Sequence, residues 1–221
     1  MMNYKLKYKI RTVDFYLIIL LLLFSVCSHL IAAKIIILPC TNIPLMSSTF
    51  TYMFVFPLTD LVRAYSTKLN ALKFFVIEMV FIIILIIMSY LLTLSPSPLW
   101  ALQYDFNRLF YLAFAIYKAN FIGILGSMIC DILLFSFLFD KILKRVIGIY
   151  WNFIFSSIIS SIIAMLIYVY ITDYIFLYKM YPSYWLKITN YNFVSDIIMI
   201  IFYSLICSII FKCVNYYLGK E

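Results

Sequence analysis

Long, uninterrupted apolar runs dominate the sequence and limit what it can fold into. Several are about 20 residues long, the length that an α-helix needs to cross the hydrocarbon core of a bilayer. Strands of a membrane barrel would instead alternate apolar and polar residues. Of the 221 residues, 67% are hydrophobic and 12% are charged, which a soluble domain of this size could not shield from water. The sequence therefore predicts an all-α, polytopic membrane protein.

The apolar runs predict a bundle of six transmembrane helices in a single membrane domain, residues 1–221. The predicted spans cover residues 15–33, 45–62, 72–92, 113–139, 149–171 and 193–214. The first is interpreted as an uncleaved span because it is longer than the apolar part of a secretory signal peptide. The fourth is too long for one perpendicular helix, so we expect it either to tilt or to begin nearer Phe121.

Basic residues lie mostly on one side of this predicted layout, where twelve of the 17 Lys and Arg residues fall. Cytoplasmic loops of membrane proteins carry such an excess. Both termini are therefore predicted to be cytoplasmic, with Lys68 and Lys144 inside and Lys34, Pro96 and Lys179 outside. Because membrane topology accounts for the net charge of +8, the sequence predicts no nucleic-acid partner; the predicted partner is the lipid bilayer.

A carboxylate stands at the inner end of the second predicted span, in the stretch Phe56-Pro57-Leu58-Thr59-Asp60-Leu61-Val62-Arg63. An ionised group at bilayer depth is costly and is functional by default. Pro57 has no backbone N–H, so it frees a carbonyl that only protein, water or a ligand can satisfy in a membrane. A broken helix beside Asp60 predicts a substrate-binding element. The alternative is a tolerated kink, with Asp60 paired to Arg63 one turn later at the cytoplasmic surface.

Three further acids lie at membrane depth: Glu78, Asp131 and, nearer the outer surface, Asp196. A buried charge without a partner would neutralise, so these acids need counter-charges. Lys118 and Arg108 are the candidates. The sequence alone does not select which pairs form.

Small and hydroxyl-bearing residues share one face of the fifth predicted span. Their offsets of three and four residues allow another helix to approach the backbone closely; they are Ser156, Ser157, Ser160, Ser161 and Ala164. We interpret the face as a packing surface, with hydroxyls lining a polar cavity as the alternative. His29 in the first span is either a proton relay or a neutral imidazole hydrogen-bonded between helices.

Enzymatic and cofactor-binding signatures are lacking. There is no H-E-x-x-H, G-x-S-x-G or phosphate-binding glycine motif, and the five cysteines show no metal-ligand spacing. The sequence therefore predicts no enzyme activity, no cofactor and no metal site. Energy from ATP would have to come from a partner.

The order of motifs in the first half resembles the queuosine precursor transporters, the bacterial YhhQ or vitamin uptake transporter family. The resemblance lies in three stretches, Ala32-Ala33-Lys34-Ile35, Phe56 to Ser66, and Ala71-Leu72-Lys73. Within them Thr59, Asp60, Arg63, Tyr65 and Ala71 follow the family's order of a Thr-Asp pair, a charged residue, an aromatic residue and an Ala. Ser66 stands where the family usually has Gly, and the charged residue is one position closer.

The resemblance continues more thinly through the second half of the chain. Arg108 after Asn107 is similar to the family's Arg at the entry to the fourth span, Asp131 to its Asp, and Ser156-Ser157 to its Ser-Thr pair. The family's amide near Met128 is missing. The family would have Gln or Asn at the position of Ser161 and Asp at the position of Ala164. The chain is therefore identified as a divergent member.

The resemblance implies import of a 7-deazaguanine base, such as preQ0, preQ1 or queuine, across the bacterial inner membrane. A carboxylate can accept the adjacent N–H and amino groups of such a base as a two-pronged pair, and Phe or Tyr can stack on its flat faces. The predicted substrate-binding residues are Phe56, Thr59, Asp60, Arg108, Asp131 and Ser157.

Two other functions are left open. Six helices with short loops also suit a substrate-binding subunit that works with a separate ATPase module. A structural or assembly protein, whose acids only pair with basic residues, is the non-transport alternative. Both the ATPase module and a homo-oligomer are left open as partners.

Overall fold

The computed structural model describes residues 4–31, 35–37, 44–65, 68–94, 104–142 and 148–218. Its helices are α1 (Tyr4–Ile31), α2 (Thr49–Tyr52), α3 (Val55–Tyr65), α4 (Lys68–Leu94), α5 (Tyr104–Phe137), the π-helical turn η1 (Leu138–Ile142), α6 (Ile149–Met180) and α7 (Trp185–Leu218). Two short strands, β1 (Ile35–Ile37) and β2 (Pro44–Met46), pair antiparallel. The predicted loop positions Lys34, Pro96 and Lys144 lie outside the described residues.

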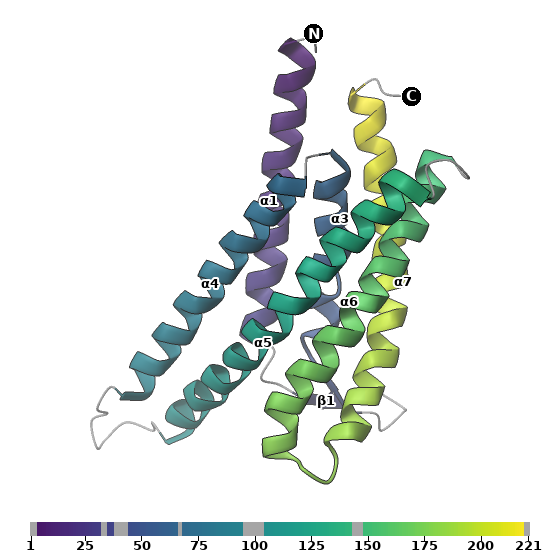
Figure 1. Ribbon diagram of the computed structural model, residues 1–221. Coiled ribbons are helices and arrows are strands. Elements are labelled where there is room, and N and C mark those ends of the chain that lie inside the picture. Colours follow the sequence, from purple (N-terminus) through teal and green to yellow (C-terminus); the bar gives the residue numbers. More distant parts are fainter. Residues whose placement is uncertain are drawn as a thin grey trace.

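The chain runs along the bundle six times if α2 and α3 are counted as one broken passage (Figure 1). α1 begins and α7 ends at the same end of the bundle. Among the described residues, four helical segments are long and apolar enough to cross a membrane: α4, residues 110–142, α6 and α7. The apolar part of α1, Phe15–His29, is shorter. The predicted fold class, an α-helical polytopic membrane bundle, is confirmed.

The second predicted span differs from a single helix. Residues 45–62 are divided among β2, the one-turn helix α2, a turn at Met53 and Phe54, and α3. Two hydrogen bonds fasten this segment to α7: Asn192 accepts one from the backbone N–H of Met46 at 3.1 Å, and the Tyr203 hydroxyl donates one to the carbonyl of Phe50. The predicted break in this span is confirmed, and it lies one turn before Pro57.

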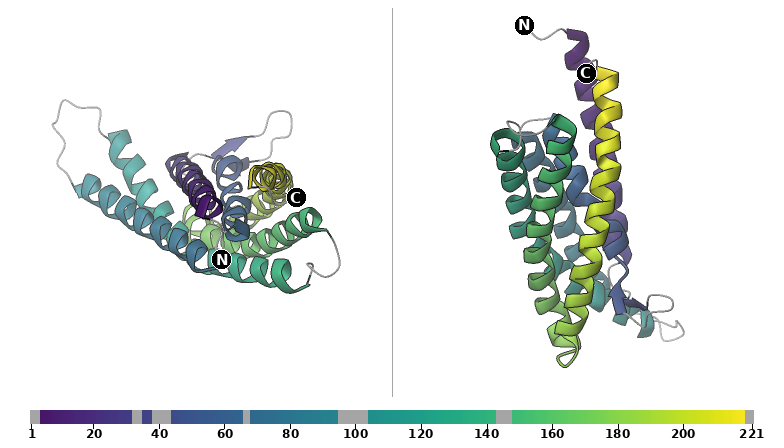
Figure 2. Two further views of the ribbon diagram at one scale, coloured as in Figure 1. Left: turned by 90° about the horizontal axis from the view of Figure 1, so that it is seen from above. Right: turned by 90° about the vertical axis from the view of Figure 1, so that its right-hand side faces the viewer.

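The fourth predicted span forms one continuous helix. α5 begins at Tyr104, so the predicted alternative of a later start near Phe121 is wrong. The helix is inclined relative to α1 (Figure 1). α4 and the first half of α5 pair with each other and lean away from the other helices. α5 also packs along α6, and α6 along α7, so these helices form a layer beside α1 and α3 (Figure 2).

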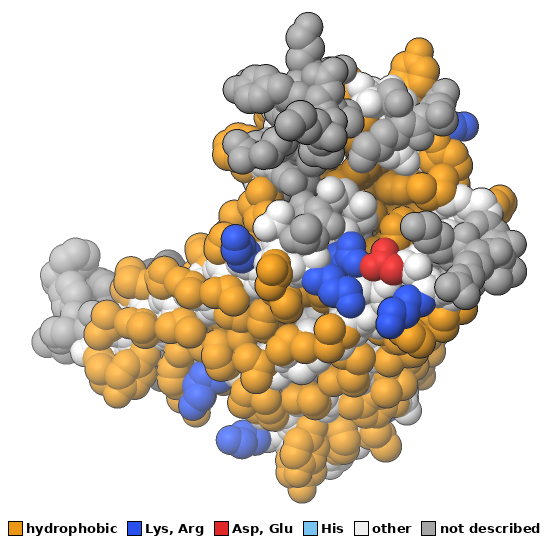
Figure 3. Space-filling view, turned by 45° about the horizontal axis from the view of Figure 1, so that its top comes forward, with side chains coloured by type: hydrophobic (Ala, Val, Ile, Leu, Met, Phe, Trp, Pro, Cys, Tyr) orange, Lys and Arg blue, Asp and Glu red, His pale blue; other side chains and the backbone are white. Residues whose placement is uncertain are grey.

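The outer surface suits contact with lipid. Large apolar side chains cover the outward faces of the long helices. Figure 3 shows a largely hydrophobic face with one small group of charged side chains near its centre and a few single basic side chains elsewhere. Polar side chains instead collect inside the bundle, where Glu78, Asp60 and Asp131 are each 0% exposed. The chain therefore places its polar chemistry in the interior.

Candidate functional site

α3 is the central element of the bundle and carries the stretch that the sequence singled out. Every residue from Val55 to Arg63 is buried. The helix contacts α1, α4, α5, α6 and α7, and the view from above shows it between its neighbours (Figure 2). Because protein surrounds α3 on all sides, its polar residues face other side chains rather than lipid, as polar groups at this depth must.

Asp60 faces the serine-rich face of α6. Its Oδ2 accepts hydrogen bonds from Ser161 at 3.4 Å and from Ser160 at 3.5 Å, both of which are long. Its Oδ1 has no hydrogen-bond partner among the described residues. The Asp60 carboxylate is therefore held between two hydroxyls and keeps one oxygen available as an acceptor.

Asp131 on α5 lies close enough to Asp60 for the two carboxylates to interact electrostatically. Neither oxygen of Asp131 has a hydrogen-bond partner among the described residues. Ser160 and Ser161 lie beside this second carboxylate as well. Two helices thus bring a pair of acids together around the same two serines, at a depth where an unpaired polar atom is expensive.

The other predicted site residues fall into three groups. Phe56 and Thr59 are buried on α3, and the Thr59 hydroxyl is used within the helix, donating to the carbonyl of Val55 at 2.9 Å. Ser157 is buried beside Asp60, with its hydroxyl 3.3 Å from that of Ser204. The side chain of Arg108 lies outside the described residues. The structure therefore brings Asp60, Asp131 and Ser157 together.

Aromatic rings line the bundle on the β2 side of Asp60. The rings of Tyr52 and Tyr168 stack with their centroids 4.9 Å apart, and Phe56 meets both rings edge-on. Phe56 lies one helical turn before Asp60, so this cluster and the acid pair share one side of α3. The Tyr52 hydroxyl has no hydrogen-bond partner among the described residues. Flat apolar surface and polar acceptors are therefore adjacent.

Two further polar groups extend from this cluster toward α1. Ser25 donates to Glu78 Oε1 at 2.8 Å, while Glu78 Oε2 has no partner in the described part of the chain. Asn120 accepts from the Tyr168 hydroxyl at 3.0 Å and lies 3.2 Å from His29 Nδ1. His29 is therefore hydrogen-bonded between helices, which is one of the two interpretations that the sequence left open.

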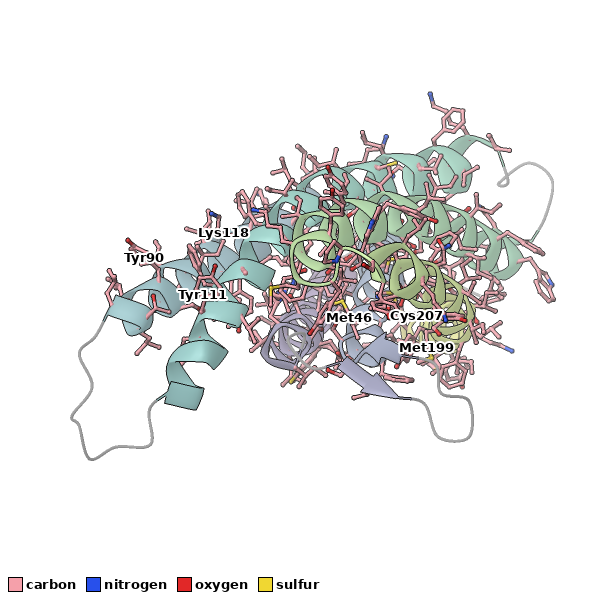
Figure 4. The ribbon with its side chains drawn as sticks, turned by 90° about the horizontal axis from the view of Figure 1, so that it is seen from below. Met46, Tyr90, Tyr111, Lys118, Met199 and Cys207 are labelled. Carbon is pink, nitrogen blue, oxygen red and sulfur yellow. The ribbon has the colours of Figure 1, made fainter. Side chains whose placement is uncertain are left out.

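The structure contradicts the alternative Asp60–Arg63 pair and one of the two candidate counter-charges, Lys118. Arg63 pairs with Asp140 of η1 and donates from Nε to Ser136 at 2.7 Å, so the ion pair that forms is not the Asp60–Arg63 pair of the alternative interpretation. Lys118 is exposed, with its amino group 5.1 Å from the ring centroid of Phe114. Figure 4 shows Lys118 on the outside of α5, away from the bundle interior.

The serine-rich face of α6 is a packing surface, as predicted, and it also contacts the Asp60 carboxylate. Ser156, Ser157, Ser160, Ser161 and Ala164 are all 0% exposed, so the face is a packing surface. Two of its hydroxyls also hydrogen-bond to Asp60. The small side chains therefore let α3 approach α6 and place the hydroxyls against the carboxylate.

Sequence reasoning missed a second polar cluster at the end of the bundle away from the termini. A cavity of about 20 Å³ lies there, bounded by the β2–α2 segment, α6 and α7. Its polar lining residues are Ser48, Tyr168, Thr172, Asp173, Asn192 and Asp196. Asp173 lies two residues beyond the predicted end of the fifth span, where an acid usually meets water. The only signal in the sequence was the continuation of apolar residues after it, Tyr174 to Tyr178.

Comparison with known proteins identifies the family. The family model described as "Putative vitamin uptake transporter" matches residues 46–218, which include α3, the acid pair and most of the bundle. Searches for similar curated proteins and for similar solved structures find no match. A match over most of the chain, together with the membrane-spanning helices, shows that this protein belongs to the vitamin uptake transporter family of membrane proteins.

Proposed function

We propose that this protein imports a queuosine precursor, a 7-deazaguanine base, across the bacterial inner membrane. The observation that carries the proposal is the buried pair of carboxylates, Asp60 and Asp131, which have three oxygens without a hydrogen-bond partner among the described residues. Buried oxygens of this kind are costly unless a ligand supplies donors. A transported base with several N–H groups supplies them.

The edge of a guanine-like base fits this acid pair. Its ring N–H and exocyclic amino group lie side by side, so one carboxylate can accept both. Asp60 is the better placed for this contact because Ser160 and Ser161 already orient its carboxylate. Asp131 then supplies a second, independent acceptor. Two neighbouring carboxylates also favour a cation, so preQ1, with its protonated aminomethyl arm, is expected to bind more tightly than the neutral preQ0.

The aromatic cluster beside the acids provides the flat surface that such a base needs. Phe56 and the stacked rings of Tyr52 and Tyr168 are all buried on the same side of α3. Planar aromatic groups stack on such rings with a favourable geometry. We therefore expect the base to bind with its donor edge toward Asp60 and one face against this cluster.

Transport requires the bundle to open, because Asp60 and Asp131 are sealed from solvent. The break between α2 and α3 is the natural hinge, since two short helices joined by a turn can move without breaking a long one. Movement of the β2–α2 segment would expose the acid pair to one side of the membrane at a time.

The experiment that tests the function is rescue of queuosine in tRNA. The full-length protein is expressed in a bacterium that can neither make nor import these bases, and preQ0, preQ1 or queuine is then supplied. Queuosine should reappear in tRNA with at least one of the three. Absence of rescue with all three, despite verified protein in the membrane, would reject this substrate class. Uptake by proteoliposomes that lack any ATPase would separate a self-sufficient transporter from a subunit of an ATP-driven importer.

A further inference from the structure

The cavity of about 20 Å³ between β2, α6 and α7 is the feature that the proposed base-binding site does not use. It lies toward the end of the bundle away from the termini, and Asp173 on its wall is 12 residues from Ser161 along α6, or about 18 Å. A cavity of this size holds one particle as large as a water molecule but no nucleobase. Its occupant is therefore distinct from the proposed substrate.

The polar walls of the cavity offer oxygen atoms and negative charge. Asp173 and Asp196 contribute carboxylates from α6 and α7, and both residues are nine-tenths or more buried. None of the described residues that line the cavity is Lys or Arg. Asn192 donates its amide N–H to Asp173 Oδ2 at 3.1 Å, which orients that carboxylate. Two carboxylates in so dry a place favour a cation.

Thr172 provides an independent sign that the cavity takes a ligand. Its side chain is 3% exposed and lines the cavity, and its hydroxyl has no hydrogen-bond partner among the described residues. The hydroxyl lies against Gly123, which has no side chain to meet it; an added Cβ there would be 2.2 Å from Thr172 Oγ1. A buried hydroxyl in the lining of a cavity that also has two carboxylates is a suitable ligand for a hard cation.

The break in the second passage lies beside the same cavity. Pro57 carries no N–H, so the carbonyl of Met53, four residues earlier, loses the donor that a continuous helix would give it. Met53 belongs to the turn between α2 and α3 and lines the cavity. Figure 4 shows Met46, another lining residue, well inside the bundle beside α6 and α7. Unwound backbone carbonyls coordinate Na⁺ in many secondary transporters.

From these contacts we propose that the cavity binds a single monovalent cation of the size of Na⁺. Its ligands are the carboxylates of Asp173 and Asp196, the hydroxyl of Thr172 and the carbonyl of Met53. Because Met53 adjoins α2 and α3, bound Na⁺ would hold the break closed from the cavity side. The ion would thereby couple its own gradient to opening of the acid pair. This coupling role rests on the proposed transport function, whereas binding of the ion does not.

Binding of ²²Na⁺ to the purified full-length protein, without any base present, tests the proposal. The assay is run in choline buffer, with unlabelled Na⁺, Li⁺ or K⁺ as competitors. We expect saturable binding that unlabelled Na⁺ displaces better than K⁺. Asp173→Asn removes a charged ligand and Thr172→Val removes a hydroxyl with little change in shape, so each should weaken ²²Na⁺ binding by at least about tenfold.

Matched controls repeat these chemical changes away from the cavity. Asp140→Asn changes an acid of η1, and Thr93→Val changes an exposed hydroxyl that donates to the carbonyl of Tyr90. Both should bind ²²Na⁺ as the unaltered protein does. Lack of saturable binding by the unaltered protein would overturn the proposal, as would unchanged binding in both Asp173→Asn and Thr172→Val. Failure of base transport with intact Na⁺ binding would reject the proposed function alone.

Discussion

Ser161 on α6 donates a hydrogen bond to the carboxylate of Asp60 on α3, with 3.4 Å between the two oxygens. The two residues are 101 positions apart in the chain, yet both are fully buried. This contact fixes the carboxylate in the centre of the bundle while leaving Asp60 Oδ1 without a partner among the described residues. It also connects a charged side chain of α3 to the helix whose small residues allow the approach.

The serine hydroxyls should matter for substrate affinity more than for folding. Each hydrogen bond to Asp60 is long, so removing one hydroxyl costs about 0.5 to 1.5 kcal/mol, and Ser160→Ala with Ser161→Ala should lose about tenfold in apparent affinity for the base. The measurement is the concentration dependence of base uptake into proteoliposomes. Ser208→Ala is the control, because Ser208 donates only to the carbonyl of Leu205. Unchanged affinity in the double variant would show that the serines only pack.

Arg63 and Asp140 should contribute unequally to stability. The Asp140 side chain is 46% exposed, so solvent screens the pair and its loss in Asp140→Ala should cost about 0 to 1 kcal/mol. Arg63→Ala should cost more, because the buried guanidinium also donates to Ser136. Thermal unfolding of the purified variants in detergent measures both effects. A larger loss of stability for Asp140→Ala than for Arg63→Ala would contradict the claim that Arg63 contributes more than its exposed partner.

Gly123 should tolerate no side chain. A Cβ at this position would lie 2.2 Å from Thr172 Oγ1 and 3.3 Å from the carbonyl oxygen of Tyr168, so α5 and α6 would have to separate. We expect Gly123→Ala to destabilise the protein by about 1 to 3 kcal/mol. Gly126→Ala is the matched control, since its Cβ would meet only Ile167 at 3.7 Å and Ala favours helix more than Gly. Equal melting temperatures for the two variants would be evidence against this packing.

Much of this architecture follows from the sequence for simple physical reasons. Continuous apolar runs favour membrane helices, so the predicted fold class is confirmed, and four of the six predicted spans fall in helices long and apolar enough to cross a membrane. Pro57 predicted the break in the second passage. The two short strands before it have no alternating pattern of apolar and polar residues, so the sequence did not predict them. α6 and α7 extend past the predicted limits because polar and aromatic residues near their shared turn continue both helices.

Contacts between distant residues were beyond the reach of the sequence. Arg63 and Asp140 are 77 positions apart, and nothing local distinguishes Asp140 from the nearer Asp60 as the partner. Asp173 was overlooked because an acid at the end of a span normally touches water, whereas here Asn192 and the β2–α2 segment cover it. Tertiary packing determines which distant residues pair and which acids are buried, and these contacts cannot be read from a single sequence.

The orientation in the membrane is a further prediction. If the excess of basic residues lies inside, single cysteines at position 179 should react with an impermeant reagent applied outside intact cells, and those at position 68 should not. Lys179 lies in the last turn of α6 and Lys68 begins α4, at opposite ends of the bundle. The native cysteines are replaced beforehand. Labelling at position 68 with none at 179 would invert the topology.

The most direct test of the account is base uptake by Asp60→Asn at matched protein abundance. Asn keeps the size of the side chain and one acceptor, but it removes the charge and presents N–H donors toward those of the base. If the carboxylate accepts a two-pronged pair, the loss should be about 1.5 to 3 kcal/mol, or about tenfold to a hundredfold in apparent affinity, with expression retained. Uptake equal to that of the unaltered protein would remove Asp60 from the binding site and contradict the mechanism.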